Sequence, residues 1–215
     1  MTQHERTTHW ITLSLLVAAV LAAGALASSS ANAQELGTKG NLAFSAERLF
    51  GLYFESRGYE GPGGIDIDQD VTVIGLGWSA GPSDALLRIP RFGIDYFLDE
   101  HLTLGGSFGV ASVSVENYDV VGIEIAGRVG YALRLSHDIY FWPRGGLTFA
   151  TLSGDGDVNV FAITLEGMFS LSPADNWTFL VGPLLDLGFA GEYGDADYHE
   201  ILFGIMFGLT GWLNI

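Results

Sequence analysis

Hydrophobic and polar residues alternate along most of the chain from Leu42 to its end. Successive side chains of a β-strand point to opposite faces, so this period of two predicts strands with one apolar and one polar face. No helical period of useful length interrupts the pattern. We expect eight strands, at residues 42–56, 71–97, 102–115, 120–135, 139–152, 158–171, 177–190 and 200–213.

The second of these segments is too long for one regular strand. It is interrupted by SAGPSDA at residues 79–85, where we expect a bulge, a bend or a loop excursion.

The connections between the segments fall into two alternating groups. Residues 98–101, 136–138 and 172–176 are short, whereas 57–70, 116–119, 153–157 and 191–199 include two long connections. If both termini lie on one side, all connections of the first group lie there too. Short turns at one end and longer loops at the other, with an even strand number, are typical of outer-membrane barrels.

The first 33 residues read as a targeting segment. A polar start with Arg6 precedes the apolar run 11–27, and Ala31-Asn32-Ala33 matches a signal-peptidase site. We predict a cleaved signal peptide at 1–33 and a barrel domain at 34–215, with an uncleaved anchor helix as the alternative. Nothing after residue 33 is apolar for long enough to span a membrane as a helix.

Charge and composition exclude several kinds of function. The chain has no Cys, and its 9 Lys+Arg residues face 25 Asp+Glu, for a net charge of -16. Disulfides and thiolate metal sites are therefore impossible. Nucleic acid is not expected as a partner, because phosphate binding needs a basic surface.

The polar face of the predicted strands is rich in small residues and carries isolated charges. In 91–97 this face holds Arg91 and Asp95, opposite Phe92, Ile94 and Tyr96, which we expect to face lipid. Acids and bases nearly balance on this face, as buried charges must. The predicted lumen charge network comprises Glu47, Asp95, Glu124, Glu166, Asp186, Arg91, Arg128, Arg134 and Arg144.

Aromatic residues gather near the short connections. They predict an interfacial girdle at one rim, made by Tyr96, Tyr140, Trp142, Trp177 and Trp212. Arg48 and Arg88 fall on the apolar face, so we expect both near a rim. For Arg48, either the strand begins after it or a bulge shifts the alternation.

Three stretches carry a family resemblance: the leader ending in ANA, the hairpin PRFGIDYFLDEHLTLGGSFG at 90–109, and the last strand ILFGIMFGLTGWLNI at 201–215. With them the chain resembles the small outer-membrane barrels of the OmpA/OmpX/OmpW type. The resemblance implies an all-β, eight-stranded antiparallel up-and-down transmembrane β-barrel in a Gram-negative-type outer membrane. It also implies contact with outer-membrane lipids and the barrel-assembly machinery. Barrels of this family commonly end in an aromatic residue, whereas this chain ends in Ile215.

The interior of an eight-stranded barrel is just wide enough to be filled by side chains. We therefore expect a mostly plugged polar lumen in a monomer with a structural, adhesive or envelope-integrity role, without cofactor or enzymatic activity. A narrow channel for small or hydrophobic solutes and a soluble, secreted lipocalin-like barrel remain alternatives. Divalent cations are candidate partners of the acidic outer loops, which contain Asp155, Asp157, Asp195 and Asp197.

Overall fold

The computed structural model describes residues 36–61, 65–76, 86–115, 118–154, 157–174, 176–194 and 196–215. The predicted signal peptide and the interruption at 79–85 lie outside these ranges. The described chain is all-β, with one short 3-10 turn, η1 (Leu86–Arg88). Its strands are β1 (Asn41–Gly61), β2 (Ile65–Leu76), β3 (Arg91–Phe97), β4 (Leu102–Val115), β5 (Tyr118–Tyr131), β6 (Leu133–Arg134), β7 (Ile139–Ser153), β8 (Val158–Ala174), β9 (Trp177–Tyr193) and β10 (Ala196–Asn214).

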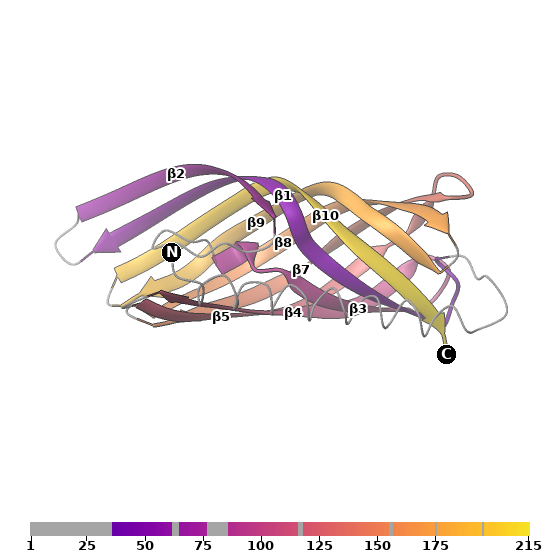
Figure 1. The fold of residues 1–215 in the computed structure, drawn as a ribbon, viewed down its shortest axis with the longest axis horizontal. Helices are drawn as coiled ribbons and strands as arrows, with labels where there is room; N and C mark the ends of the chain where they lie inside the picture. Colours follow the sequence, from indigo (N-terminus) through magenta and orange to yellow (C-terminus); the bar gives the residue numbers. More distant parts are fainter. Residues whose placement is uncertain are drawn as a thin grey trace.

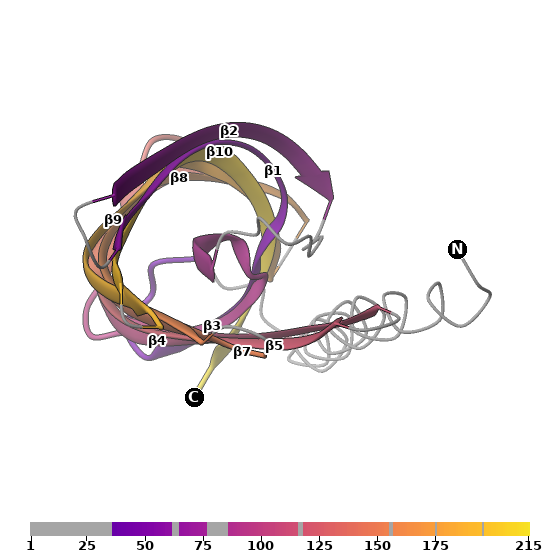
Figure 2. The same ribbon diagram turned by 90° about the vertical axis from the view of Figure 1, so that its left-hand side faces the viewer.

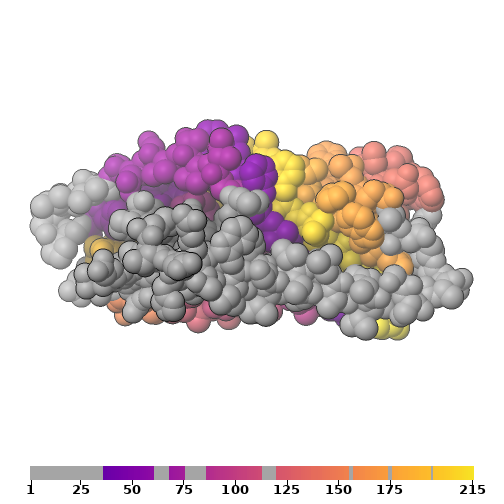
Figure 3. Space-filling model, viewed as in Figure 1, coloured from indigo at the N-terminus to yellow at the C-terminus, as the bar shows by residue number. Residues whose placement is uncertain are grey.

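The strands close into an antiparallel ring, seen end-on in Figure 2. β1 pairs along its length with β10, and this seam lies on the face shown in Figure 3. The other edge of β1 pairs with β3 near Ala43 and with β2 beyond Phe50. β2 and β3 thus share one position of the wall, and β6 continues β5 along β7. The predicted eight-stranded up-and-down barrel is therefore confirmed.

The predicted long loops at 57–70 and 191–199 are wrong. β1 and β2 continue as a hairpin that pairs Glu60 with Asp66, and β9 and β10 pair as far as Tyr193 and Ala196. The hairpin of β1 and β2 projects beyond the rest of the wall in Figure 1. Above a membrane both faces of a strand meet water, so its residues lose the apolar alternation that marks a strand in the sequence.

The three predicted short connections lie at one end of the barrel. Leu98 N donates to Leu102 O (2.9 Å) across the first, and Ser172 N donates to Asp138 O (2.8 Å) between the second and third. Asn41 pairs with Asn214, so the beginning of β1 and the end of β10 meet at this same end. We call it the short-turn end.

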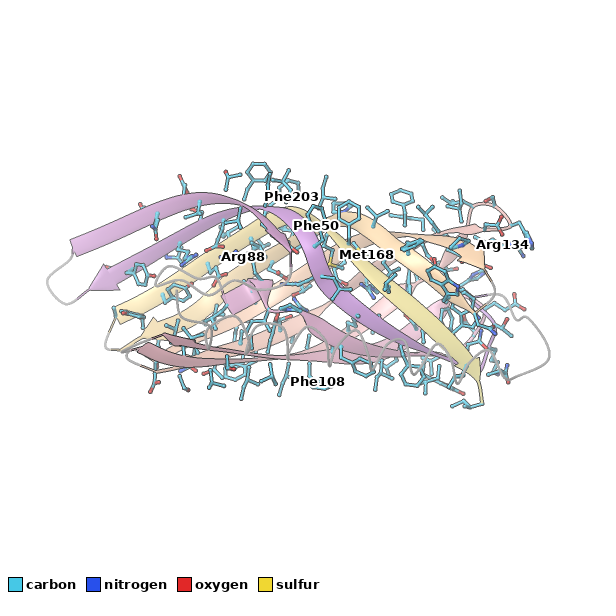
Figure 4. All side chains as sticks on the ribbon, viewed as in Figure 1. Phe50, Arg88, Phe108, Arg134, Met168 and Phe203 are labelled. Carbon is cyan, nitrogen blue, oxygen red and sulfur yellow. The ribbon has the colours of Figure 1, made fainter. Side chains whose placement is uncertain are left out.

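Apolar side chains cover the outside of the wall. Phe50, Phe108 and Phe203 project outward in Figure 4, and each is more than a third exposed. In β3, Ile94 and Tyr96 are exposed while Arg91 and Asp95 are buried. An apolar exterior around a charged interior is the arrangement of a membrane barrel, because lipid solvates the outer face. Within the ranges above, no helix has the length and apolar character to cross a bilayer.

Candidate functional site: the charged lumen

The middle of the lumen is occupied by ion pairs, most of which join non-adjacent strands. Arg128 of β5 contacts Glu47 of β1 (Nη1–Oε2, 2.7 Å) and Asp95 of β3 (Nε–Oδ1, 3.0 Å). Arg144 of β7 reaches Glu47 Oε1 (2.7 Å) and Glu166 Oε2 of β8 (2.7 Å). All five side chains are nearly or fully buried. They tie five strands together across the barrel interior.

A second group adjoins the first on the same level of the barrel. Arg48 Nη2 lies 2.7 Å from Asp186 Oδ2, and Arg91 Nη2 lies 2.8 Å from Glu124 Oε1. Thr164 Oγ1 also donates to Asp186 Oδ1 (2.5 Å). The structure therefore brings together eight of the nine predicted network residues.

Arg134 does not join this network, and its prediction is corrected. It lies beyond the buried part of the wall, where the chain leaves β6 for the turn at 135–138, and its side chain is exposed. Its Nε donates to Ser136 O (3.1 Å), and it is labelled at the short-turn end in Figure 4. Strict alternation placed it inward, but Arg134 is the last residue of β6 paired with β7, and at this end of the wall the side chain is exposed.

Arg48 was expected near a rim and lies instead in the central network. The register between β1 and β10 shifts between Ala46 and Phe50, and Arg48 has φ 57°. This bulge turns the consecutive residues Glu47 and Arg48 both inward, so each can pair with opposite charges. The bulge interpretation of the sequence is therefore correct and the rim position is wrong.

A third group fills the lumen farther along β1. Glu55 pairs with Arg57 and with Arg88 (Nε–Oε2, 3.1 Å), so the position expected for Arg88 at a rim is also wrong. Arg88 belongs to η1, which turns into the ring in Figure 2. Leu87 N donates to Glu200 Oε1 (3.3 Å), and Tyr198 OH donates to Glu200 Oε2 (2.7 Å). These contacts hold η1 inside the barrel.

Two glycines make room for this inward turn. A Cβ at Gly109 or Gly122 would lie 2.7 Å from a methyl carbon of Ile89, which follows η1 and is fully buried. Only residues without a side chain let Ile89 pack this closely on the inner face of β4 and β5.

The predicted aromatic girdle is partly corrected, because three of its five members point into the lumen. Tyr96 and Trp177 are exposed on the outer face, whereas Tyr140, Trp142 and Trp212 are buried inside. Trp142 Nε1 donates to Thr103 Oγ1 (3.2 Å), and its ring lies 5.6 Å from that of Phe97. These rings and aliphatic residues fill the lumen between the charges and the short-turn end.

Sequence reasoning missed Arg48, Glu55, Arg57, Arg88 and Glu200 as members of the lumen network. Glu55 already lies in the first predicted strand, on the inward alternation of Glu47 and Tyr53. Arg57 is the next position of that alternation, just beyond the predicted end of the strand. Arg88 carried no such signal, because its position depends on η1 folding back into the ring.

Outside the lumen, some titratable side chains form hydrogen bonds within turns. Asp99 Oδ1 accepts hydrogen bonds from His101 N and Leu102 N, both at 2.7 Å. These backbone N–H groups, Leu102 first, hold the pKa of the Asp99 carboxyl below its usual value. Among the residues with assigned positions, no three His, Asp or Glu side chains are arranged to hold a metal ion. Asp155 and Asp195 of the acidic loops lie outside the described residues.

No protein-family model matches the sequence, and no curated protein matches it either. Among solved structures, the Neisserial surface protein NspA is similar with a TM-score of 0.50 and 9% identity, over 80% of this chain and 97% of that protein. The outer membrane protein AlkL, determined in lipid bilayers, has a TM-score of 0.50 and 14% identity, over 87% of this chain and 97% of that one. The chain thus has the fold of the small eight-stranded outer-membrane β-barrels.

Proposed function

We propose that this protein is an outer-membrane barrel that works through its surface and its stability rather than as an open pore. Its role would be structural, adhesive or in envelope integrity. The observation that carries the proposal is the filling of the lumen at three successive levels: buried rings near Trp142, the central ion pairs around Arg128, and η1 with the pairs around Glu55. A water-filled pore needs a continuous polar passage, and buried side chains at three successive levels argue against one.

The apolar exterior supports residence in a membrane and argues against the soluble lipocalin-like alternative. Outward residues such as Ile125 (57% exposed) and Leu147 (63%) belong to a broad apolar band. A soluble protein would expose this band to water, which is unfavourable. Cell fractionation tests this point. The protein should sediment with outer membranes and show heat-modifiable gel mobility, and recovery in the soluble fraction would contradict it.

Single-channel recording in planar bilayers tests the closed lumen. The wild-type chain should give no steady conductance. A double variant, Glu47→Ala with Arg128→Ala, serves as the control, because it removes the central pair and should raise conductance if it folds. Steady conductance of the wild type would overturn the closed-lumen proposal.

A second candidate is passage of small hydrophobic solutes through the outer half of the barrel. There the inner face carries the apolar side chains of Val120, Ala150, Val160 and Leu202 beside the charged group around Glu55. Among the described strands, β4 has a partner on the β3 side only as far as Phe108. The wall beside the apolar lining is therefore less completely paired than the rest.

Vesicle uptake separates this candidate from the first. Vesicles that contain the protein should take up an apolar dye faster than empty vesicles, with no gain for a polar dye of similar size. Ala150→Phe, which would fill the apolar lumen, should reduce the gain. Equal uptake by vesicles with and without the protein would exclude this function.

A further inference from the structure

Among the residues that the structure describes, the charges inside the lumen do not balance. Seven buried carboxylates, Glu47, Glu55, Asp95, Glu124, Glu166, Asp186 and Glu200, face six buried guanidinium groups, Arg48, Arg57, Arg88, Arg91, Arg128 and Arg144. With all of them ionised, one negative charge is in excess. Every Lys and Arg after residue 33 lies among the described residues, and the other two, Lys39 and Arg134, are exposed. The chain itself therefore has no further cation to supply to the lumen.

The excess can be located by asking which carboxylates lack hydrogen bonds. Glu47, Asp95 and Asp186 accept hydrogen bonds from arginines. Glu124 and Glu166 are buried too, yet neither oxygen of either carboxylate accepts one. Each has arginine nitrogens close by but without hydrogen-bond geometry. Arg91 Nη2 lies 2.8 Å and Arg48 Nη1 3.9 Å from Glu124 Oε1. Arg144 Nη2 lies 2.7 Å and Arg128 Nη1 3.8 Å from Glu166 Oε2. Leaving a buried carboxylate in this state is costly.

A small void adjoins Glu166. Its volume is about 10 Å³, and its lining includes the polar side chains of Arg91, Arg128, Arg144, Thr148 and Thr164 besides Glu166. This is roughly the space of one water-sized particle. Asp186 is linked to the void through its hydrogen bond from Thr164, and Arg48 pairs with Asp186 from the other side. Glu47 and Asp95 face it across Arg128 and Arg144.

We propose that the folded barrel binds one monovalent cation from the solution, either a proton on Glu124 or Glu166 or an alkali ion in the void beside Glu166. The bound charge neutralises the lumen and gives an unsatisfied carboxylate a partner. Three guanidinium groups border the void, which favours a proton on a carboxylate oxygen over a metal ion in the void. The inference depends on the closed lumen and not on the role of the protein in the envelope.

The direct test measures how many protons the wild-type chain takes up when it folds. The full chain is refolded from urea into detergent micelles in weakly buffered solution near pH 7, and the pH change is recorded. Uptake of about one proton per folded chain is expected. Because the folded state would then bind more protons than the unfolded one, the folding equilibrium constant should fall about tenfold per pH unit as the pH rises.

The alkali-ion form gives a different result. Proton uptake would be absent, and stability would rise when sodium replaces tetramethylammonium, which is too large for the void, at constant ionic strength. Either result supports a bound cation and identifies it. If refolding takes up no proton and sodium has no effect, the inference is overturned, whatever conductance measurements show.

Amide variants locate the site. Glu124→Gln and Glu166→Gln remove one negative charge with almost no change of shape, and at least one of them should abolish the proton uptake or the sodium dependence. Glu192→Gln, at an exposed position of β9, is the matched control and should keep the wild-type behaviour. Persistence of the effect in both lumen variants would overturn the assignment to Glu124 and Glu166.

Discussion

Arg128 and Glu47 form two parallel contacts, Nη1 to Oε2 at 2.7 Å and Nη2 to Oε1 at 2.8 Å, although they lie 81 positions apart. Their strands, β5 and β1, are not neighbours in the wall. The pair therefore connects opposite parts of the ring, which backbone hydrogen bonds between adjacent strands cannot do. Bidentate pairing of this kind is the strongest form of arginine–carboxylate contact.

Replacing Arg128 by Ala should destabilise the barrel by ~3–5 kcal/mol, because Glu47 and Asp95 would remain buried with one cation fewer. Urea unfolding in detergent micelles, followed by gel mobility, measures the change. The control is Arg134→Ala, whose side chain is exposed, and its effect should stay within ~0.5 kcal/mol. Equal losses in the two variants would contradict the assignment of Arg128 to a buried network.

Gly93 and Gly127 provide a matched pair. A Cβ at Gly93 would collide with Ser45 Oγ and Arg128 Nη2, whereas nothing lies within 4 Å of one at Gly127. We expect Gly93→Ala to cost ~1–3 kcal/mol through displacement of the ion pair. Gly127→Ala should be neutral or stabilising by ~0.5 kcal/mol. The same urea unfolding measurement compares the two variants. A Gly93→Ala variant as stable as wild type would contradict the close packing of Gly93 against Ser45 and Arg128.

Trp142→Ala should cost ~3–5 kcal/mol, because it opens a cavity between the ion pairs and the short-turn end and leaves Thr103 without a donor. Trp177 lies on the outer face, so Trp177→Ala should cost clearly less. Thermal loss of the folded gel band compares the two variants. A larger loss for Trp177 would favour the interfacial girdle expected from the sequence.

Substitutions on the outer surface can test where the wall faces lipid. Ile125 is 57% exposed in the middle of β5, where Ile125→Arg should cost ~2–4 kcal/mol in lipid. Leu98→Arg, beside the first short turn, should cost only ~0–1 kcal/mol because the charge reaches the interface. Folding yields and urea midpoints in phospholipid vesicles check this. Similar costs at both positions would argue against a membrane band centred near Ile125.

The turn at Asp99 predicts a pH effect outside the membrane. The pKa of this carboxyl is lower in the folded chain than in the unfolded one, because Leu102 N and His101 N donate to it. Its stabilising contribution is therefore full above the ordinary aspartate pKa and is lost as the pH falls through the lower, folded value. Asp99→Ala should melt below wild type at neutral pH, and the difference should shrink in acid. A difference that does not change with pH would exclude the charge-assisted turn.

Alternation in the sequence was sufficient to predict the strands and the inward direction of Arg91, Asp95 and Arg128, because a period of two is set by the strand itself. It failed where the backbone leaves that period. The bulge at Arg48 shifts which face a residue occupies, and Arg134 stands at the last paired position of β6, where its side chain is exposed. Inward aromatic residues such as Trp142 cannot be told from interfacial ones in the sequence. The sequence shows how close a residue is to the end of a strand, but not whether its ring packs inside the lumen or lies on the outer surface.

The pairing of Asn41 with Asn214 has a consequence for assembly. Arg48 of β1 and Asp186 of β9 are separated by 138 positions, so we expect them to meet only when β10 closes the ring against β1. Before that moment the sheet is open, and Arg48 of β1 lacks its partner on β9. An open intermediate would expose those charges to lipid at high cost. Ring closure and charge pairing should therefore occur as one cooperative step, which makes the last strand to arrive the one that commits the chain to the membrane.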